Sequence, residues 1–217
     1  ITQGSLHEFA QLMMANRMRD HILPTAKWLM APHFIFDRVK NLWRTKMESR
    51  QIAHHYNLDN RLYQLFLDDD WHYSAGHFER EGMTLEEAQL VKKRYITSKL
   101  AVEANHRVLD IGCGWGGLDF YIAELTGAHV TGISLSEEQL KIARRRAVNR
   151  NLTDKTEFLL QNYRDTNGCF DRIVSIEVLE HIGKNNYDVF FQKAFELLDR
   201  FGVCVIQSTV RPSPKMS

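Results

Sequence analysis

One segment constrains the fold of this chain more than any other: an apolar run that ends in a cluster of glycines. Residues 108–118 read Val-Leu-Asp-Ile-Gly-Cys-Gly-Trp-Gly-Gly-Leu. Glycines allow a tight turn and a close approach of a ligand to the main chain, and the first N–H groups of a following helix point toward that ligand. The segment therefore predicts a buried strand, a ligand-binding turn and a helix, as at the start of a nucleotide-binding α/β sheet.

After residue 106, short β-branched runs alternate with helical patterns, which predicts a parallel sheet covered by helices. The expected strands are Arg107 to Ile111, His129 to Ser134, Thr156 to Leu160, Asp171 to Ile176 and Val203 to Ser208. Ser136 and Gln139 have the spacing of a capping box, and Gly202 has the position of a left-handed helix cap. The expected fold class is α/β, with a Rossmann-like sheet.

Residues 1–53 are expected to form a helical N-terminal region, and 54–217 the catalytic domain. The first region carries eight basic and four acidic side chains, although the net charge of the chain is only +1. Between residues 34 and 50, apolar residues at helical spacing alternate with basic ones, which is typical of a helix at a membrane surface. A helix that packs on the neighbouring domain gives the same pattern, so both interpretations stay open.

Composition excludes several classes of protein. The near-neutral net charge gives no overall attraction for nucleic acid. No apolar run approaches the roughly 20 residues of a membrane-spanning helix. The three cysteines show no Cys-x-x-Cys spacing, which argues against disulfides and favours a reducing, cytoplasmic location. Because the chain begins at Ile1 and ends soon after its fifth expected strand, we expect it to be part of a longer product.

The acidic residue of the glycine segment indicates the kind of ligand. Asp110 stands before the first glycine, at the end of the expected strand. A carboxylate there suits the ammonium and sulfonium groups of S-adenosylmethionine better than the pyrophosphate of a dinucleotide, which needs only N–H donors. We therefore expect a methyl-donor site of the class I methyltransferase type, formed by Asp110, Gly112, Gly114 and Trp115.

The ends of the second and third strands are expected to bind the rest of this donor. No acid stands at the end of the second strand, so Ser134, Leu135 and Gln139 are the candidates for the ribose, with helix capping as the alternative role of Gln139. After the third strand, Asn162, Tyr163 and Arg164 are expected to border the adenine. Tyr163 would stack on the base, and packing against the sheet is its alternative role.

Glu180 and His181 follow the fourth strand, where open α/β sheets place their chemistry. The alternative is an ordinary solvated helix start. An Asn-Pro-Pro or Asp-Pro-Pro element, typical of enzymes that methylate nucleic-acid amino groups, is absent at this point. Four histidines (His54, His55, His72 and His77) are expected to pack in aromatic loops, and no metal site is expected.

Several ordered motifs resemble the cyclopropane-fatty-acyl-phospholipid synthase family, which includes the mycolic acid methyltransferases. The resemblance runs from about His54 to Ser208. Its motifs are residues 55–60 (His-Tyr-Asn-Leu-Asp-Asn), 65–68 (Leu-Phe-Leu-Asp), 73–78 (Tyr-Ser-Ala-Gly-His-Phe), the glycine segment, 132–139, 161–165 and Glu180-His181.

This resemblance implies S-adenosylmethionine-dependent transfer of a methyl carbon to a double bond of a fatty acyl chain, usually on a membrane phospholipid. It implies that Tyr73 and Ser74 close over the donor. Tyr73, Glu180 and His181 would belong to the catalytic site. The glycines and the ends of the second and third strands would hold the donor as expected above. It also implies a cytoplasmic protein at the inner membrane face; a homodimer stays open.

Two positions depart from the family pattern. Ring closure needs a base, which the family is thought to supply as a bound bicarbonate, and two of its expected ligand positions hold Ala75 and Gln207 in place of Cys and His. A methyl-branched or methylated unsaturated product is therefore the alternative to a cyclopropane. A methyltransferase for a small molecule, or a donor- or lipid-binding protein without catalysis, are further alternatives. The resemblance also implies a sheet of seven strands, so we expect a further part after Ser217 to complete it.

Overall fold

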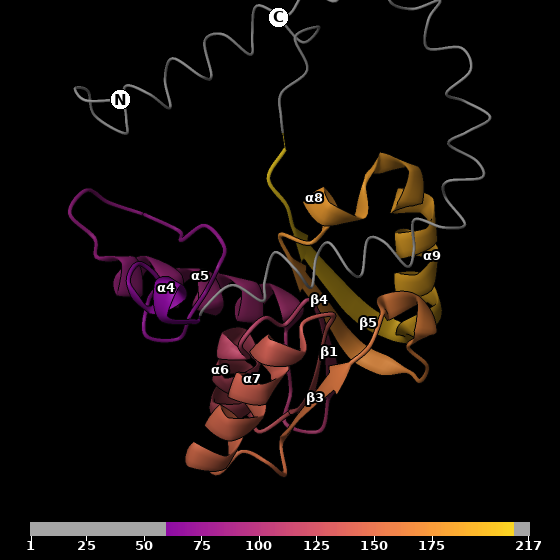
Figure 1. Ribbon diagram of the computed structural model, residues 1–217. Coiled ribbons are helices and arrows are strands. Elements are labelled where there is room, and N and C mark those ends of the chain that lie inside the picture. The colour runs from indigo at the N-terminus through magenta and orange to yellow at the C-terminus, as the bar shows by residue number, and fades with distance from the viewer. Residues whose placement is uncertain (1–59, 211–217) are drawn as a thin grey trace, which may run out of the picture. The chain divides into compact units, whose positions relative to one another are not determined.

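A five-stranded parallel sheet forms the centre of the computed structural model, which describes residues 60–210 (Figure 1). The strand order is β3-β2-β1-β4-β5. The strands are β1 (Arg107–Ile111), β2 (His129–Ser134), β3 (Thr156–Leu160), β4 (Phe170–Ile176) and β5 (Leu198–Gln207). The predicted helical region 1–53, with its proposed membrane-surface helix, lies outside the described residues, as do His54 and His55.

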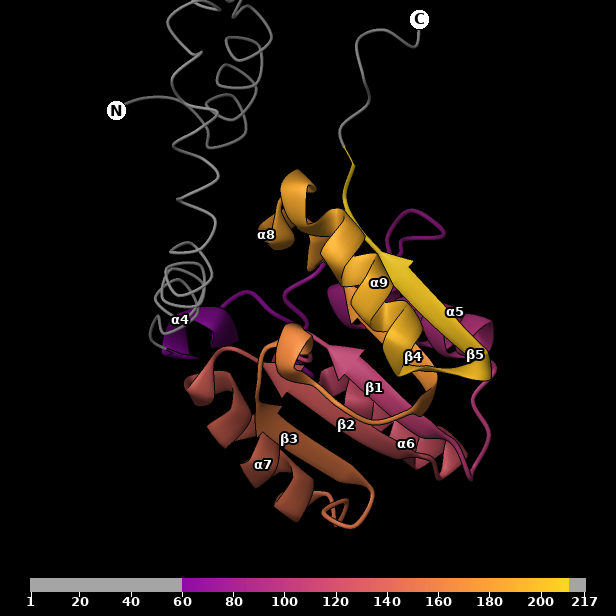
Figure 2. The ribbon, with the colours of Figure 1, turned by 90° about the vertical axis from the view of Figure 1, so that its right-hand side faces the viewer.

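Helices cover both faces of this sheet (Figure 2). One face packs on α5 (Leu85–Leu100), α6 (Gly117–Thr126) and α7 (Glu137–Asn149), and the other on α8 (Leu179–Ile182) and α9 (Tyr187–Leu197). The shorter elements are α4 (Asn60–Gln64), η1 (Tyr163–Asp165) and η2 (Lys184–Asn186). Because strands buried on both faces need continuous apolar runs, the core of β1 is formed by the fully buried Val108 and Leu109.

The topology brings the predicted site residues to one edge of the sheet. The chain passes from β1 outward through β2 to β3, and then returns to place β4 on the other side of β1. The direction of winding therefore reverses between β1 and β4, which is where open α/β sheets bind ligands. The pairs Ile111–Ile133 and Ile176–Gln207 show that the carboxyl ends of neighbouring strands meet at this edge.

The predicted strands are confirmed, with two differences in local detail. β5 begins at Leu198, five residues earlier than expected, because α9 ends at Leu197 and the chain becomes extended at once. Gly202 is therefore not a helix cap. It is needed for close packing, since a Cβ atom there would lie 2.6 Å from Cγ of Leu198 and 3.0 Å from the carbonyl oxygen of Asp171.

The predicted capping box of α7 is only half formed. The Ser136 hydroxyl accepts a hydrogen bond from the Gln139 N–H (3.3 Å), as expected of an N-cap. The N–H of Ser136, however, donates to Ser134 Oγ (3.1 Å) and not to the Gln139 side chain. A complete capping box occurs instead at α5, between Thr84 and Glu87. The Gln139 side chain is thus available for another contact.

Candidate functional site

The glycine turn after β1 forms an open cradle of main chain. Gly112, Gly114 and Gly116 have φ values of +91°, +56° and +81°, which side chains with a Cβ atom rarely adopt. A Cβ atom on Gly112 would lie 2.4 Å from Cγ2 of Val178, so this glycine lets the segment after β4 approach the turn. A Cβ atom on Gly114 would meet nothing within 4 Å, so the main chain there is bare on its open side.

Such a cradle fits the methionine end of S-adenosylmethionine, because a bare turn followed by the N-terminus of α6 accepts a ligand without steric conflict. Trp115 lies on the other side of the turn. It is 1% exposed, and its ring centroid is 4.9 Å from that of Tyr63 and 5.7 Å from that of Trp71. The structure therefore assigns Trp115 a packing role, and a donor contact from this residue remains a prediction.

Asp110 lies in the interior at the end of β1, beside Asp119 of α6. Both carboxyl groups are at most 3% exposed. Burial raises the pKa of Asp110 to about 7, and burial followed by the charge of Asp110 raises that of Asp119 well above its usual range. Asp110 was expected to be an ionised donor ligand; burial instead favours its protonated form, and the same holds for Asp119, a residue that sequence reasoning did not single out.

The end of β2 places three candidate ribose ligands together. The Ser134 hydroxyl donates to Gln139 Oε1 (3.0 Å), and both residues are less than a tenth exposed. Leu135, between them, is half-buried. This contact shows why the capping box is incomplete: the Gln139 amide turns toward the strand end. The Gln139 side chain is thereby bound to the carboxyl end of β2, where the ribose is expected.

The segment after β3 is more deeply packed than expected. Tyr163 is 7% exposed, and its ring lies 5.2 Å from that of Phe190 of α9, centroid to centroid. The guanidinium of Arg164 lies 4.7 Å from the centre of the Tyr163 ring. Asn162 Oδ1 accepts a hydrogen bond from the Arg164 N–H (3.0 Å) and caps η1. Tyr163 thus shows its alternative role, packing against the sheet, while the adenine contacts of Asn162 and Arg164 remain predictions.

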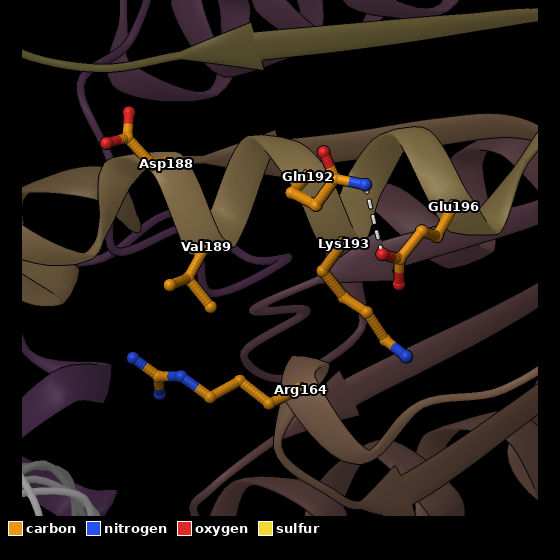
Figure 3. Close-up of a pocket in the computed structure, with 6 residues that line it drawn as sticks. All are labelled: Arg164, Asp188, Val189, Gln192, Lys193 and Glu196. Carbon is orange, nitrogen blue, oxygen red and sulfur yellow. Dashed lines mark hydrogen bonds between the residues drawn. The ribbon is translucent and has the colours of Figure 1, made fainter.

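A pocket of about 550 Å³ lies between η1 and α9 (Figure 3). Its lining residues are polar with one exception: Arg164, Asp188, Val189, Gln192, Lys193 and Glu196. Arg164 is the one predicted donor residue among them, and the glycine turn does not contribute to the lining. The pocket is therefore separate from the cradle formed by the turn.

Residues 73–76, here called the strap, run across α5. Tyr73, which the sequence predicted to close over the donor, is 45% exposed, and its ring packs edge-on against that of Tyr63 at 5.4 Å. The N–H of His77 donates to the carbonyl oxygen of Ala88 (3.1 Å), which fixes the end of the strap to the helix. A Cβ atom on Gly76 would lie 3.0 Å from that of Ala88. The strap therefore lies directly on α5.

Three side chains that sequence reasoning missed hold the strap in place. Lys92 Nζ donates to Ser74 Oγ (2.6 Å), and Gln89 Nε2 donates to the Ser74 carbonyl oxygen (2.8 Å). The N–H of Ala75 donates to Oε1 of Glu177, at the end of β4 (3.0 Å). Gln89 and Lys92 stand three residues apart on one face of α5. The sequence shows two polar residues at this spacing, but only the structure shows that both are buried.

The segment before the strap is fastened by ion pairs. The carboxylate of Asp70 binds Lys93 Nζ (2.5 Å) and the guanidinium groups of Arg146 (2.9 Å) and Arg150 (2.5 Å). Asp70 also packs on the first turn of α6, since a Cβ atom on Gly117 would lie 2.7 Å from its carbonyl oxygen. Arg146 is therefore a half-buried link between α7 and this segment.

A second buried pair, Asp68 and His72, lies on either side of Asp70 in the sequence. Asp68 Oδ2 accepts a hydrogen bond from His72 Nδ1 (2.8 Å). Burial acts to raise the pKa of Asp68, but the hydrogen bonds and charge of His72 outweigh it and hold the pKa at about 2. Burial lowers the pKa of His72 despite that partner. His72 therefore has a structural partner, and within residues 60–210 no group of three or more His, Cys, Asp or Glu side chains is arranged to hold a metal.

Glu180 and His181 lie on α8, next to the carboxyl end of β4, and both are exposed. Glu180 Oε1 accepts hydrogen bonds from the Ser208 hydroxyl (2.9 Å) and from the N–H of Thr209. The carboxylate is thus held by the chain that leaves β5. Gln207, one of the two departures from the family pattern, accepts a hydrogen bond from the Glu177 N–H through its carbonyl oxygen (2.8 Å).

Glu177 is therefore hydrogen-bonded to both residues that differ from the family pattern, Ala75 and Gln207. Its own backbone is unusual, because φ is +55° at a residue that is not glycine. Left-handed backbone at such a residue is strained and is often found where a side chain must be aimed at a site. The sequence gives no sign of this conformation, which depends on how β4 and β5 end side by side.

Comparisons with known proteins agree with this geometry. The family model for mycolic acid cyclopropane synthetase matches residues 43–217. A probable fatty acid methyltransferase of Pseudomonas putida is 41% identical over 152 residues, which are 69% of this chain and 39% of that protein. The cyclopropane-fatty-acyl-phospholipid synthase of Escherichia coli (strain K12) is 38% identical over 178 residues, 82% of this chain and 44% of that protein.

Among solved structures, the mycolic acid cyclopropane synthase CmaA1 complexed with SAH and CTAB is similar, with a TM-score of 0.70 and 35% identity over 73% of this chain and 55% of that chain. The present chain spans less than half the length of the two curated relatives above. The fold is thus that of a class I methyltransferase, and S-adenosylmethionine is the cofactor of the family. The match covers most of the sequence, and the chain belongs to the mycolic acid cyclopropane synthetase family.

Proposed function

We propose that the protein transfers a methyl or methylene carbon from S-adenosylmethionine to a double bond of an unsaturated fatty acyl chain, as a cyclopropane synthase does. The observation that carries the proposal is the bare main chain at Gly114, open at the strand edge where Ser134 and Glu180 also lie. The relatives named for fatty acid methylation and cyclopropane synthesis support the substrate class.

The residues of the chain divide the work of binding. The glycine turn accepts the methionine end of the donor, Ser134 and Gln139 meet the ribose, and Asn162 and Arg164 border the adenine. Tyr73 and Ser74 of the strap close the open side. Bound in this way, S-adenosylmethionine supplies a methyl group that is already strongly electrophilic. Because an alkene is a weak nucleophile, alignment by these residues accounts for much of the catalysis.

Glu180 stabilises the positive charge that develops on the acyl chain. A carboxylate that is already held by Ser208 and Thr209 does not need to reorganise when that charge appears. Aromatic side chains near the strap, among them Tyr63 and Tyr73, exclude water that would trap the cation. His181, on the same short helix, is proposed as a neighbour of this charge.

A second outcome, methylation without ring closure, is favoured by Ala75 and Gln207. These positions offer Glu177 a main-chain N–H and a main-chain carbonyl group, and neither brings a Cys or His side chain. A bound bicarbonate would lack those two ligands here. Loss of a proton from the acyl chain would then give a methylated unsaturated product, whereas a saturated methyl-branched product would need a separate reductant to deliver hydride to the cation.

We propose a phospholipid as the acyl carrier, and a cytoplasmic protein bound at the inner membrane face through residues 34–50. The basic and apolar residues of that segment support the proposal. None of the helices within residues 60–210 is long and apolar enough to cross a bilayer. A homodimer is compatible with this arrangement.

Mass spectrometry of lipids from cells that express the full-length gene tests the proposal. Acyl chains that gain the mass of one CH₂ group are the expected result, and fragmentation separates a ring from a branch. Donor binding without any modified lipid would favour a binding protein. Transfer to free acids in a protein that does not bind liposomes would favour a small-molecule methyltransferase.

A further inference from the structure

Two charged side chains of opposite sign grip neighbouring residues of the strap. Lys92 of α5 binds the hydroxyl of Ser74, and Glu177 at the end of β4 binds the N–H of Ala75. The two side chains come from elements on different sides of the strap and attract each other electrostatically. Ser74 and Ala75 are thus held between the helix and the sheet.

The position of Lys92 is costly for the folded protein. The side chain is 4% exposed, and burying an ammonium group without full compensation opposes folding. Of its three N–H donors, one makes a hydrogen bond within the described residues, to Ser74. A helix that needed only an apolar contact here would be better served by methionine, so the charge is retained for a reason other than stability.

The backbone conformation of Glu177 also opposes folding. Its φ of +55° strains a residue that has a Cβ atom, and glycine would remove the strain. The next residue, Val178, packs directly over Gly112 of the glycine turn. Glu177 therefore contacts the strap through its carboxylate and the end of β5 through its N–H, and it is followed by the residue that packs on the glycine turn.

We propose that Lys92 and Glu177 are the positioning residues of the donor site, and that together they hold the strap closed across the glycine turn. Gln89, which binds the Ser74 carbonyl oxygen, is a neutral third support. This inference rests on the proposed function, because it assumes that the strap closes over the methyl donor. Lys92 and Glu177 act through Ser74 and Ala75, and neither is required to touch the reacting atoms.

The proposal has a consequence for the dependence on pH. Burial lowers the pKa of Lys92 to about 8, while the charges of Glu177 and Asp68 oppose that shift and Lys93 adds to it. His72 also faces Lys92, and its pKa lies below the usual value. Near neutral pH the ammonium is therefore present, and it is lost as the pH rises through about 8. The hydrogen bond from Lys92 to the Ser74 hydroxyl should therefore weaken over that range.

Calorimetric titration of the full-length protein with S-adenosylmethionine tests the proposal. Lys92→Met and Glu177→Gly should each weaken donor binding by about 10- to 100-fold, as expected for a lost charge-assisted hydrogen bond. Their melting temperatures should equal or exceed that of the wild type, because each change removes a cost of folding. Lys99→Met and Glu86→Gln, exposed positions on the same helix, should bind the donor as the wild type does.

A pH series separates positioning from a general structural role. The affinity of the wild type for the donor should fall between about pH 7 and about pH 9. Lys92→Arg should bind the donor better than Lys92→Met and should keep its affinity over this range, because arginine stays protonated. Unchanged affinity in both variants would overturn the proposal, as would a loss of affinity that only follows a lower melting temperature. A Glu177→Gly protein that binds the donor normally but loses turnover would also overturn it, by placing the carboxylate in the chemistry. If the wild type itself binds no donor, the proposed function fails first.

Discussion

Asp110 and Asp119 lie beside each other in the interior, where neither carboxyl group is more than 3% exposed. Asp110 Oδ1 and both carboxyl oxygens of Asp119 have no hydrogen-bond donor among the described residues. Two carboxyl groups in such surroundings are most stable when protonated, because burial disfavours each charge and two buried negative charges would repel each other. The pair joins β1 to α6, the two elements on either side of the glycine turn.

This pair should make the protein less stable as the pH rises. The pKa of Asp110 is about 7 in the folded protein, above the unfolded value, so the contribution is fully present below about pH 4 and is lost as the pH rises through about 7. The linked change is on the order of 2 to 4 kcal/mol. Chemical denaturation at several pH values measures it. Asp110→Asn should flatten this dependence, and parallel curves for variant and wild type would contradict the raised pKa of Asp110.

Gly114 should be essential for donor binding but not for folding. In Gly114→Ala, the strain of a φ of +56° costs about 1 to 2 kcal/mol, and the new methyl group enters the open cradle. Donor affinity should fall at least tenfold in calorimetric titration.

Gly82→Ala is the matched control for this change. Gly82 has a φ of +77° and nothing within 4 Å of an added Cβ atom, and it lies in the loop before α5. It should lose similar stability with normal donor affinity. Equal affinity losses in the two variants would mean that strain, and not occupation of the cradle, is responsible.

Asp70 should be a main anchor of the segment that carries the strap. In Asp70→Ala, Lys93 and Arg146 lose their carboxylate partner while they remain largely buried, whereas Arg150 keeps its ion pair with Glu124; the change should cost about 3 kcal/mol. Burial acts to raise the pKa of Asp70, but Lys93 and the two arginines hold it below its usual value. Its contribution is therefore present near neutral pH and is lost as the pH falls through the folded-state pKa.

Thermal unfolding measures this effect, with the exposed neighbour Asp69 as control. Asp69→Ala should change the unfolding free energy by less than about 0.5 kcal/mol. If Asp70→Ala lost no more stability than Asp69→Ala, the three cationic groups would have found other partners.

Glu180→Gln should separate chemistry from donor binding. The amide keeps the size of the side chain and still accepts a hydrogen bond from the Ser208 hydroxyl, but it has no negative charge to stabilise a cation. Turnover of unsaturated lipid should fall by about 10²-fold or more, with donor affinity unchanged. Wild-type turnover would show that Glu180 only anchors the chain after β5.

Much of the sheet is predictable from local pattern. The limits of β1, β2 and β3 follow from short apolar, β-branched runs, and the turn after β1 follows from its glycines. Such features depend on residues that are close in the sequence. This reasoning fails at Gly202. A glycine after a helix indicates a helix cap, but here glycine is required because a Cβ atom would lie too close to Leu198 and Asp171.

The sheet and the glycine turn follow from local patterns in the amino-acid sequence, and its ordered motifs indicate the kind of donor. Which charges are buried, and which distant residues are in contact, is visible only in the folded chain. Lys92 and Ser74 are 18 residues apart, and Ala75 and Glu177 are 102 apart. The physical reason is that burial and pairing of charges depend on contacts between distant segments, whereas turns and strands depend mainly on neighbouring residues.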